Sequence, residues 1–139
     1  MFESLVCSRG REIAMTFNLV CIINAVIAFG FGIAFVVGAE PTAAMYGLTL
    51  SPGGLLLARL LGAAFLGYGV ITFQARNTAD SPARQAIALG LVVGNAIGGV
   101  IALLGVTSGV VNALGWSSVA IYLLLAAGFG MTGLAKSAA

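Results

Sequence analysis

The chain contains no histidine and only two cysteines, and both shortages limit the chemistry open to it. Cys7 and Cys21 are separated along the chain, with Cys21 inside an apolar run, so neither a disulfide framework nor a Cys/His metal site is expected. The sequence also lacks a Cys-x-x-Cys pair, a glycine-rich phosphate loop and paired carboxylates within an apolar run. Haem ligation, hydrolysis and proton relays need such groups. We therefore predict no catalytic site, no metal site and no enzymatic activity.

Charge is equally scarce. Charged residues make up 7% of the chain and hydrophobic residues 60%, and the mean hydropathy is +1.12. A soluble domain of 139 residues needs a polar shell, which so few charged side chains cannot form. The net charge of +2 rests on six basic and four acidic residues and gives no argument for nucleic-acid binding. The composition instead predicts an integral membrane protein whose partners are lipids or other membrane protein subunits.

Four apolar stretches are long enough for the roughly 20 residues that a helix needs to cross a bilayer. They cover residues 13–37, 53–73, 83–104 and 111–131. The first is too long for the core of a signal peptide, so we expect it to remain as a membrane anchor. The sequence therefore predicts a single all-α membrane domain over residues 1–139, folded as a four-helix bundle.

The segments between these stretches carry turn and capping signals. Residues 42–50 are too few and too mixed to cross a membrane, so we expect them at the membrane interface, with Tyr46 at headgroup depth. Ser81 followed by Pro82 is typical of an N-cap and the first turn of a helix, and should start the third span.

Basic residues predict the orientation, because short loops rich in Lys and Arg stay in the cytoplasm. With four spans they all fall on one side: Arg9, Arg11, Arg76, Arg84 and Lys136. The opposite loops, 38–52 and 105–110, contain no basic residue, and Glu40 is their sole charge. Both termini are therefore predicted to be cytoplasmic, with the chain in a bacterial inner membrane.

Arg59 is the one ionisable residue inside a predicted span, and such a charge is a functional hypothesis by default. Its helical neighbours Gly62, Ala63 and Leu66 form a small-residue face, so we expect the arginine to point into the bundle or towards a partner. Glu40 lies on the same side of the membrane as its natural counter-ion. The favoured interpretation is a purely structural pair, with Arg59 reaching towards the headgroups. Alternatively, the guanidinium holds an anionic lipid headgroup or the polar end of a quinone or pigment.

Three polar side chains sit deep within the predicted spans. Asn24 and Asn95 both lie near the mid-plane, where an unpaired amide is expensive. The simplest expectation is that they bond to each other and join two helices, and a polar pocket for a ligand is the alternative. The Tyr68 hydroxyl needs a partner as well, and Tyr68 is a candidate ligand-binding residue.

The third span carries a stripe of small residues at intervals of four, which lets helix backbones approach closely. The stripe consists of Ala86, Gly90, Gly94 and Gly98. A neighbouring helix of the same chain is the default partner, although a second subunit would use the same physics.

Three sequence segments carry a resemblance to a known family. They are Leu57 to Gly67 (LARLLGAAFLG), Gly109 to Trp116 (GVVNALGW) and Ile121 to Leu125 (IYLLL). From Asn24 to Gly130, the chain resembles a family of small four-helix bacterial membrane proteins of unknown function, distantly grouped with the DoxX/DoxD-like proteins. Some DoxD-like relatives are associated with quinone-linked oxidoreductases. The resemblance thus implies the same fold and topology, and points towards a respiratory or photosynthetic electron-transfer complex.

Two functional hypotheses follow from these observations. In the first, the protein is an accessory or structural subunit that packs against a larger membrane complex through its small-residue stripes. In the second, it is a binding module for a lipophilic small molecule such as a quinone, a carotenoid or a lipid, and needs no other cofactor. The missing catalytic groups favour the first hypothesis, and a redox enzyme comes third.

Overall fold

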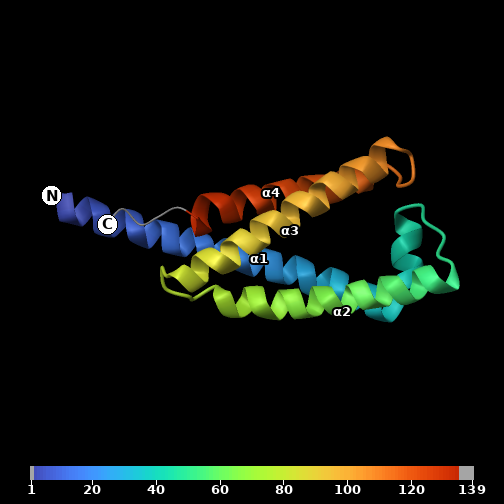
Figure 1. The fold of residues 1–139 in the computed structure, drawn as a ribbon, viewed down its shortest axis with the longest axis horizontal. Coiled ribbons are helices and arrows are strands. Elements are labelled where there is room, and N and C mark those ends of the chain that lie inside the picture. Colours follow the sequence, from blue (N-terminus) through green and yellow to red (C-terminus); the bar gives the residue numbers. More distant parts are fainter. Residues whose placement is uncertain (1, 135–139) are drawn as a thin grey trace.

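The computed structural model describes residues 2–134 and is all-helical over that range (Figure 1). Its elements are α1 (Phe2–Met45), α2 (Pro52–Ala75), α3 (Pro82–Thr107) and α4 (Gly115–Gly133). Each helix is long and apolar enough to cross a membrane. The prediction of four apolar helices is therefore confirmed, and the fold is that of a multi-pass membrane protein.

The helix boundaries agree with the predicted spans in the middle of the chain and differ at its two ends. α2 and α3 begin at Pro52 and Pro82, and Ser51 and Ser81 cap them by accepting hydrogen bonds from backbone N–H groups. α1 is longer than the predicted 13–37, because the charged opening is helical too. α4 starts at Gly115 and not at 111, because residues 108–114 form the connection from α3.

α1 is kinked near its C-terminal end. Gly38 has a non-helical backbone (φ −134°, ψ 55°), and Pro41 follows within the helix, where it lacks the N–H that would continue the hydrogen-bond ladder. The Thr42 hydroxyl donates to the Gly38 carbonyl at 2.7 Å and stabilises the bend. The chain stays helical as far as Met45, in a new direction, and the interfacial position of residues 42–50 stays a prediction.

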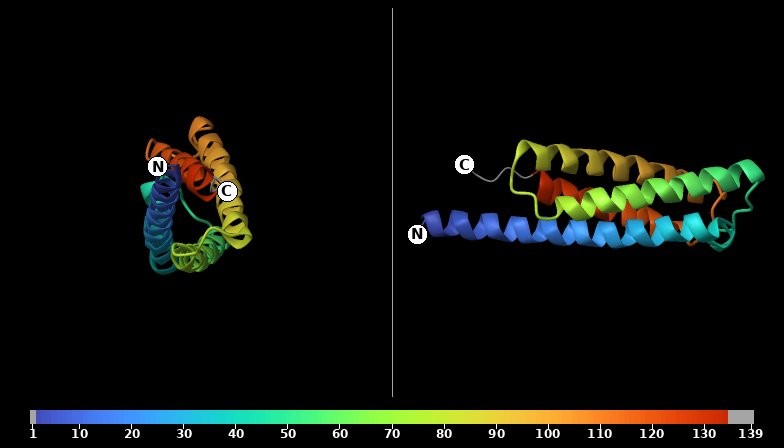
Figure 2. Two further views of the ribbon diagram at one scale, coloured as in Figure 1. Left: turned by 90° about the vertical axis from the view of Figure 1, so that its left-hand side faces the viewer. Right: turned by 90° about the horizontal axis from the view of Figure 1, so that it is seen from below.

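The four helices are arranged as two hairpins. α1 packs along α2, and α3 packs along α4, whereas contacts between the hairpins are fewer and fall mainly between α1 and α4 (Figure 2). Within the first hairpin the backbones approach closely at two glycines. A methyl group on Gly62 would lie 2.9 Å from the Gly32 carbonyl oxygen, so only glycine allows this helix crossing.

The two hairpins join tightly at the end of the bundle where the chain termini lie, which we call the terminal end. Its core consists of Phe17, Cys21, Ala88, Leu91, Leu125 and Phe129. Phe17 and Phe129 meet edge to face with ring centroids 6.3 Å apart. Gly133 fits against Ala88 and Phe17 in a space that would not admit a larger residue.

Arg84 belongs to this terminal-end core, although its place beside a polar loop gave no sign of burial. It is 5% exposed, lies 4.1 Å above the Phe17 ring and donates to the Thr132 carbonyl at 2.9 Å. The arginine therefore ties the start of α3 to the end of α4 and covers the aromatic core of α1.

Towards the opposite end, the loop end, the hairpins diverge (Figure 1). The kinked end of α1 crosses the resulting gap and meets the α3–α4 connection. Asn112 fixes this contact: its backbone N–H donates to the Tyr46 carbonyl at 3.0 Å and its amide to the Met45 carbonyl at 2.9 Å. The hairpins are thus joined at both ends and separated between them.

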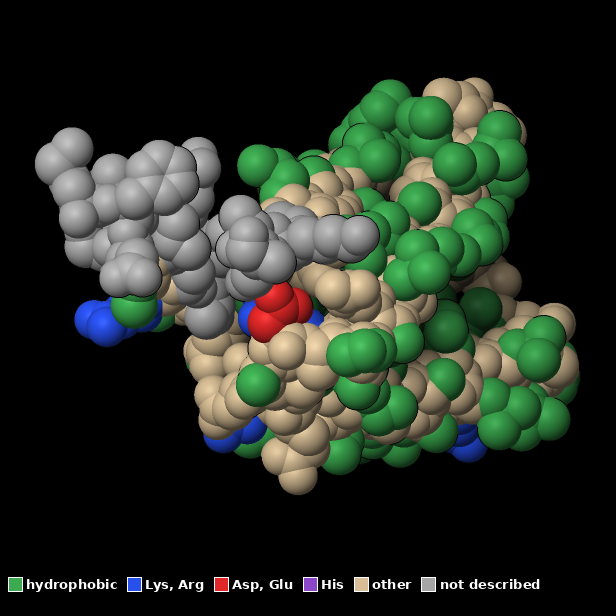
Figure 3. Space-filling view, turned by 60° about the vertical axis from the view of Figure 1, so that its left-hand side comes forward, with side chains coloured by type: hydrophobic (Ala, Val, Ile, Leu, Met, Phe, Trp, Pro, Cys, Tyr) green, Lys and Arg blue, Asp and Glu red, His purple; other side chains and the backbone are tan. Residues whose placement is uncertain are grey.

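All four helices carry exposed large hydrophobic side chains, and such side chains are prominent on the face shown in Figure 3. Val37 is 79% exposed, Leu124 73% and Met131 75%. In water such a surface would be strongly unfavourable, but lipid tails solvate it without cost. The distribution of side chains agrees with the membrane environment that the composition predicts.

Candidate functional site

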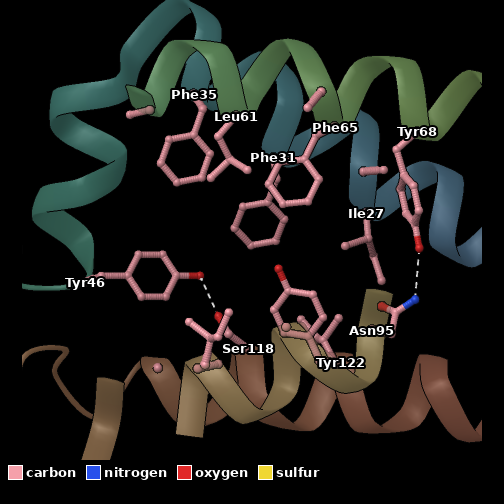
Figure 4. Close-up of a pocket in the computed structure, with 18 of the residues that line it drawn as sticks. Ile27, Phe31, Phe35, Tyr46, Leu61, Phe65, Tyr68, Asn95, Ser118 and Tyr122 are labelled. Carbon is pink, nitrogen blue, oxygen red and sulfur yellow. Dashed lines mark hydrogen bonds between the residues drawn. The ribbon is translucent and has the colours of Figure 1, made fainter. Parts of the chain in front are cut away.

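A cavity of about 660 Å³ occupies the space between the diverging hairpins. All four helices contribute to its wall, together with the loop-end segment that follows the α1 kink. Phe31, Phe35 and Phe65 form an aromatic side on the first hairpin (Figure 4). Ile101, Ile121 and Leu125 contribute from the second hairpin. None of the described residues that line the cavity is Lys, Arg, Asp or Glu, so this lining is apolar and uncharged.

Polar side chains close the cavity towards the terminal end. The Asn95 amide donates to the Tyr68 hydroxyl at 2.9 Å and to the Leu91 carbonyl at 2.7 Å. The Asn24 amide donates to the Thr72 hydroxyl at 3.0 Å, and Thr72 donates to the Tyr68 carbonyl at 2.6 Å. These four residues form a polar floor that connects α1, α2 and α3, and each of their amide or hydroxyl groups has a partner, as burial requires.

A second polar contact closes the loop end of the cavity. The Ser118 hydroxyl donates to the Tyr46 hydroxyl at 3.3 Å (Figure 4). Tyr46 is carried across the gap by the kinked end of α1, whereas Ser118 belongs to the first turns of α4. The bend at Gly38 therefore supplies one wall of the cavity.

Tyr122 projects into the cavity from α4, with its hydroxyl directed at the space between the hairpins (Figure 4). Within the described residues its hydroxyl makes no hydrogen bond, in contrast to those of Tyr46 and Tyr68. The ring lies against Gly98 of α3, where a methyl group would come within 2.7 Å of the Tyr122 Cε1 atom. Gly98 thus provides the flat surface on which the ring rests.

The cavity has a sideways route to the surface. α2 and α3 are consecutive helices, yet they are not among the extensively packed pairs. The surface is hollowed between the two hairpins (Figure 3). A molecule dissolved in the bilayer could therefore enter from the side, without passing through water.

The predicted Arg59–Glu40 pair is not formed. Arg59 is exposed on α2 and does not turn into the bundle, and Glu40 is exposed as well. Within residues 2–134 neither residue makes an ion pair with the other, and neither lines the cavity. The cause is the kink at Gly38, which carries the segment with Glu40 towards the other hairpin (Figure 1). A role for Arg59 at a lipid headgroup stays a prediction.

The predicted contact between Asn24 and Asn95 is also wrong in its pairing, though both amides are buried and bonded. Thr72 and Tyr68 of α2 act as their partners. The expectation that Tyr68 needs a partner is confirmed, and Tyr68 lines the cavity.

Most of the small-residue stripe does not serve helix packing within the chain. Ala86, Gly90 and Gly94 are exposed, and a methyl group at either glycine would meet no atom within 4 Å. Gly94 and Gly98 line the cavity. A close approach of two helix backbones lies elsewhere, at Gly32 and Gly62, whereas Ala86, Gly90 and Gly94 do not face a neighbouring helix of the described chain.

Tyr122, Tyr46 and the three phenylalanines were not predicted to share a site. Tyr122 has only the general signal of an aromatic side chain with a polar end, and the phenylalanines resemble any other apolar residue of a span. No group of three or more His, Cys, Asp or Glu side chains is placed to hold a metal ion in the part of the chain that the structure describes.

Comparison of the chain with protein-family models, curated proteins and solved structures gave no match. The resemblance to DoxX/DoxD-like proteins therefore stays a prediction, and the function has to be argued from the site itself.

Proposed function

We propose that the protein binds a neutral lipophilic molecule in the cavity between its two hairpins. The observation that carries the proposal is the cavity of about 660 Å³ with an aromatic and aliphatic wall and no charged lining residue. Small-molecule sites have volumes of roughly 300–1,000 Å³ and combine apolar walls with a few polar groups that fix orientation. Tyr46, Tyr68 and Tyr122 are such groups, spread over the length of the cavity.

The uncharged lining also narrows the class of ligand. An anionic headgroup buried here would have no cation to pair with, and an unpaired buried charge is strongly unfavourable. Of the ligands considered from the sequence, quinones, carotenoids and acyl chains fit this chemistry, whereas binding of a charged headgroup by Arg59 would have to occur outside the cavity.

A pair of adjacent alanines on α2 provides the test. Both are exposed, but Ala64 lines the cavity and Ala63 does not. We expect Ala64→Phe to fill part of the cavity and to reduce the lipophile that co-purifies with the protein, while Ala63→Phe retains it. The bound molecule is measured by solvent extraction and mass spectrometry of the protein purified in mild detergent. Wild-type protein without a bound lipophile, or equal retention by both variants, would contradict the proposal.

The accessory-subunit hypothesis is a second candidate, supported by Ala86 and Gly90. Both are exposed on α3, and Gly90 has no atom of the described chain near it, so another transmembrane helix could approach closely there. The partner would be a larger membrane complex, of which a respiratory or photosynthetic one is the example that the resemblance suggests. Gly90→Leu should then abolish co-purification of partner proteins and leave lipophile retention intact.

We propose further that the termini are cytoplasmic and that the protein lies in a bacterial inner membrane. The distribution of basic residues supports this orientation. A reporter fused to either terminus should give a cytoplasmic signal. A periplasmic signal from one terminus and a cytoplasmic signal from the other would exclude an even number of spans.

A further inference from the structure

The three tyrosines of the cavity differ in how their hydroxyl groups are used. Tyr68 is bonded to Asn95 at the floor, and Tyr46 is bonded to Ser118 at the loop end. The Tyr122 hydroxyl lies between these two contacts and points into the cavity, with no hydrogen bond to any described residue (Figure 4). Among these three hydroxyl groups, it is therefore the one without a hydrogen-bond partner in the part of the chain that the structure describes.

The position of this hydroxyl is fixed by the packing of its ring. Gly98 leaves room for the ring, which lies so close to α3 that a methyl group there would approach Cε1 and Cδ1 to 2.7 and 2.9 Å. Tyr122 is consequently held between α3 and α4 and is half-buried. One turn earlier on the stripe, Gly94 lines the same cavity without touching any such side chain.

The chemistry of the hydroxyl indicates which group it would bind. A phenolic hydroxyl is a good donor and a weaker acceptor, because its oxygen lone pair is delocalised into the ring. In an apolar cavity an unused donor is unfavourable relative to one that is bonded. Because the lining contains no charged residue, the matching acceptor is a neutral oxygen.

We infer that the ligand carries a carbonyl oxygen that accepts a hydrogen bond from Tyr122, with its apolar part against the phenylalanine side of the cavity. This inference rests on the proposed function and adds the specificity-determining residue and the chemical class: a lipophilic ketone or quinone, and not a pure hydrocarbon. Gly98 is a positioning residue, because it acts through the Tyr122 ring.

Two probes that differ by a single oxygen test the inference. Phenyl undecyl ketone and dodecylbenzene have the same ring and the same number of carbon atoms, and only the first has a carbonyl group. Wild-type protein in lipid nanodiscs is equilibrated with an equimolar mixture of the two probes. The ratio of retained ketone to retained dodecylbenzene is then divided by the same ratio for empty nanodiscs. We expect the ketone to be retained about fivefold more strongly, the ratio that one typical net hydrogen bond provides.

The variants separate the hydroxyl from the rest of the site. Tyr122→Phe should lower the ratio to about one without changing retention of dodecylbenzene, which also shows that the variant is folded. Tyr46→Phe should keep the wild-type ratio, because the bond from Ser118 holds that hydroxyl at the loop end of the cavity (Figure 4); a ratio of about one in this variant would assign the donor to Tyr46 and overturn the inference. Gly98→Ala should lower the ratio by moving the ring, whereas Gly94→Ala should not, because it meets open space.

The possible failures are distinguishable. Equal retention of both probes by wild-type protein, or a ketone preference that survives in Tyr122→Phe, would overturn the inference and leave the proposed function standing. Retention of neither probe above the level of empty nanodiscs would overturn both.

Discussion

The two ends of the bundle contain the same kinds of residue but differ in how densely these residues pack. At the terminal end, Phe17 and Phe129 pack edge to face, Gly133 closes against Ala88, and little space is left. At the loop end the hairpins diverge, and similar side chains, among them Phe31 and Phe65, line an open cavity instead of filling it. The comparison suggests that the terminal end holds the hairpins together, so that the loop end can stay open for a ligand.

The boundary between the two ends is polar. Asn24, Tyr68, Thr72 and Asn95 lie between the terminal-end core and the cavity, and each is bonded to another helix or to its own. In lipid, hydrogen bonds give specific partners where apolar side chains do not distinguish a neighbouring helix from a lipid tail. The polar floor can therefore set the depth at which the hairpins begin to diverge.

The largest loss of stability is expected for a substitution in the terminal-end core. Phe17 is 1% exposed and contacts both Phe129 and Arg84. Truncating such a residue leaves a cavity, so Phe17→Ala should destabilise the fold by about 3–5 kcal/mol. Unfolding in mixed micelles of increasing denaturing-detergent content measures this. Phe31→Ala at the cavity wall is the matched control, and an equal loss for both would remove the distinction between the ends.

A smaller loss of stability is expected when a glycine at a close helix crossing is replaced by alanine, and a glycine that faces open space provides the comparison. Gly62→Ala would bring a methyl group to 2.9 Å from backbone atoms of α1, so the first hairpin must separate, at a loss of about 1–3 kcal/mol. Gly94→Ala, which faces open space, should be neutral in the same unfolding assay. The opposite order would mean that the stripe on α3, and not the Gly32–Gly62 crossing, holds the helices together.

The smallest effect is expected at the polar floor. Asn24→Leu removes the bond to Thr72, and interhelical hydrogen bonds in membrane proteins contribute about 0.6 kcal/mol on average. Stability should therefore fall only slightly. If the floor sets the divergence, however, crosslinking between cysteines introduced at Ala64 and Ala102, on opposite walls of the cavity, should change in rate. An unchanged rate would leave the floor with no role in shaping the cavity.

The number of helices, the start of α3 and the need for polar partners could be predicted from the sequence, because they depend on the surrounding lipid or on local interactions. A helix in lipid must satisfy its own backbone, so four long apolar runs become four helices. Ser81 with Pro82 marked the start of α3 because capping is a local interaction. The need for partners at Asn24, Asn95 and Tyr68 followed from the energy of burying polar groups, which does not depend on which partner is found.

The identity of those partners, and the site they belong to, could not be predicted. In a soluble protein the spacing of apolar residues reveals which face of a helix is buried. Here both the lipid-facing and the buried faces are apolar, so the sequence does not distinguish Ala63 from Ala64, or Gly94 from Gly62. The Arg59–Glu40 pair failed for a related reason: the direction of the chain after Gly38 is set by contacts of Tyr46 and Asn112 that are distant in sequence.

Composition and hydropathy were enough to predict a membrane environment, four helices and few charges along them, because each of these follows from the free energy of placing single residues in lipid. The pairing of the helices into two hairpins joined at their ends, and the position of the Tyr122 hydroxyl in an open cavity without a partner among the described residues, are visible in the three-dimensional arrangement alone. Those features depend on small differences in how closely two backbones can approach. Such differences arise between helices and are not encoded in the hydropathy of any one of them.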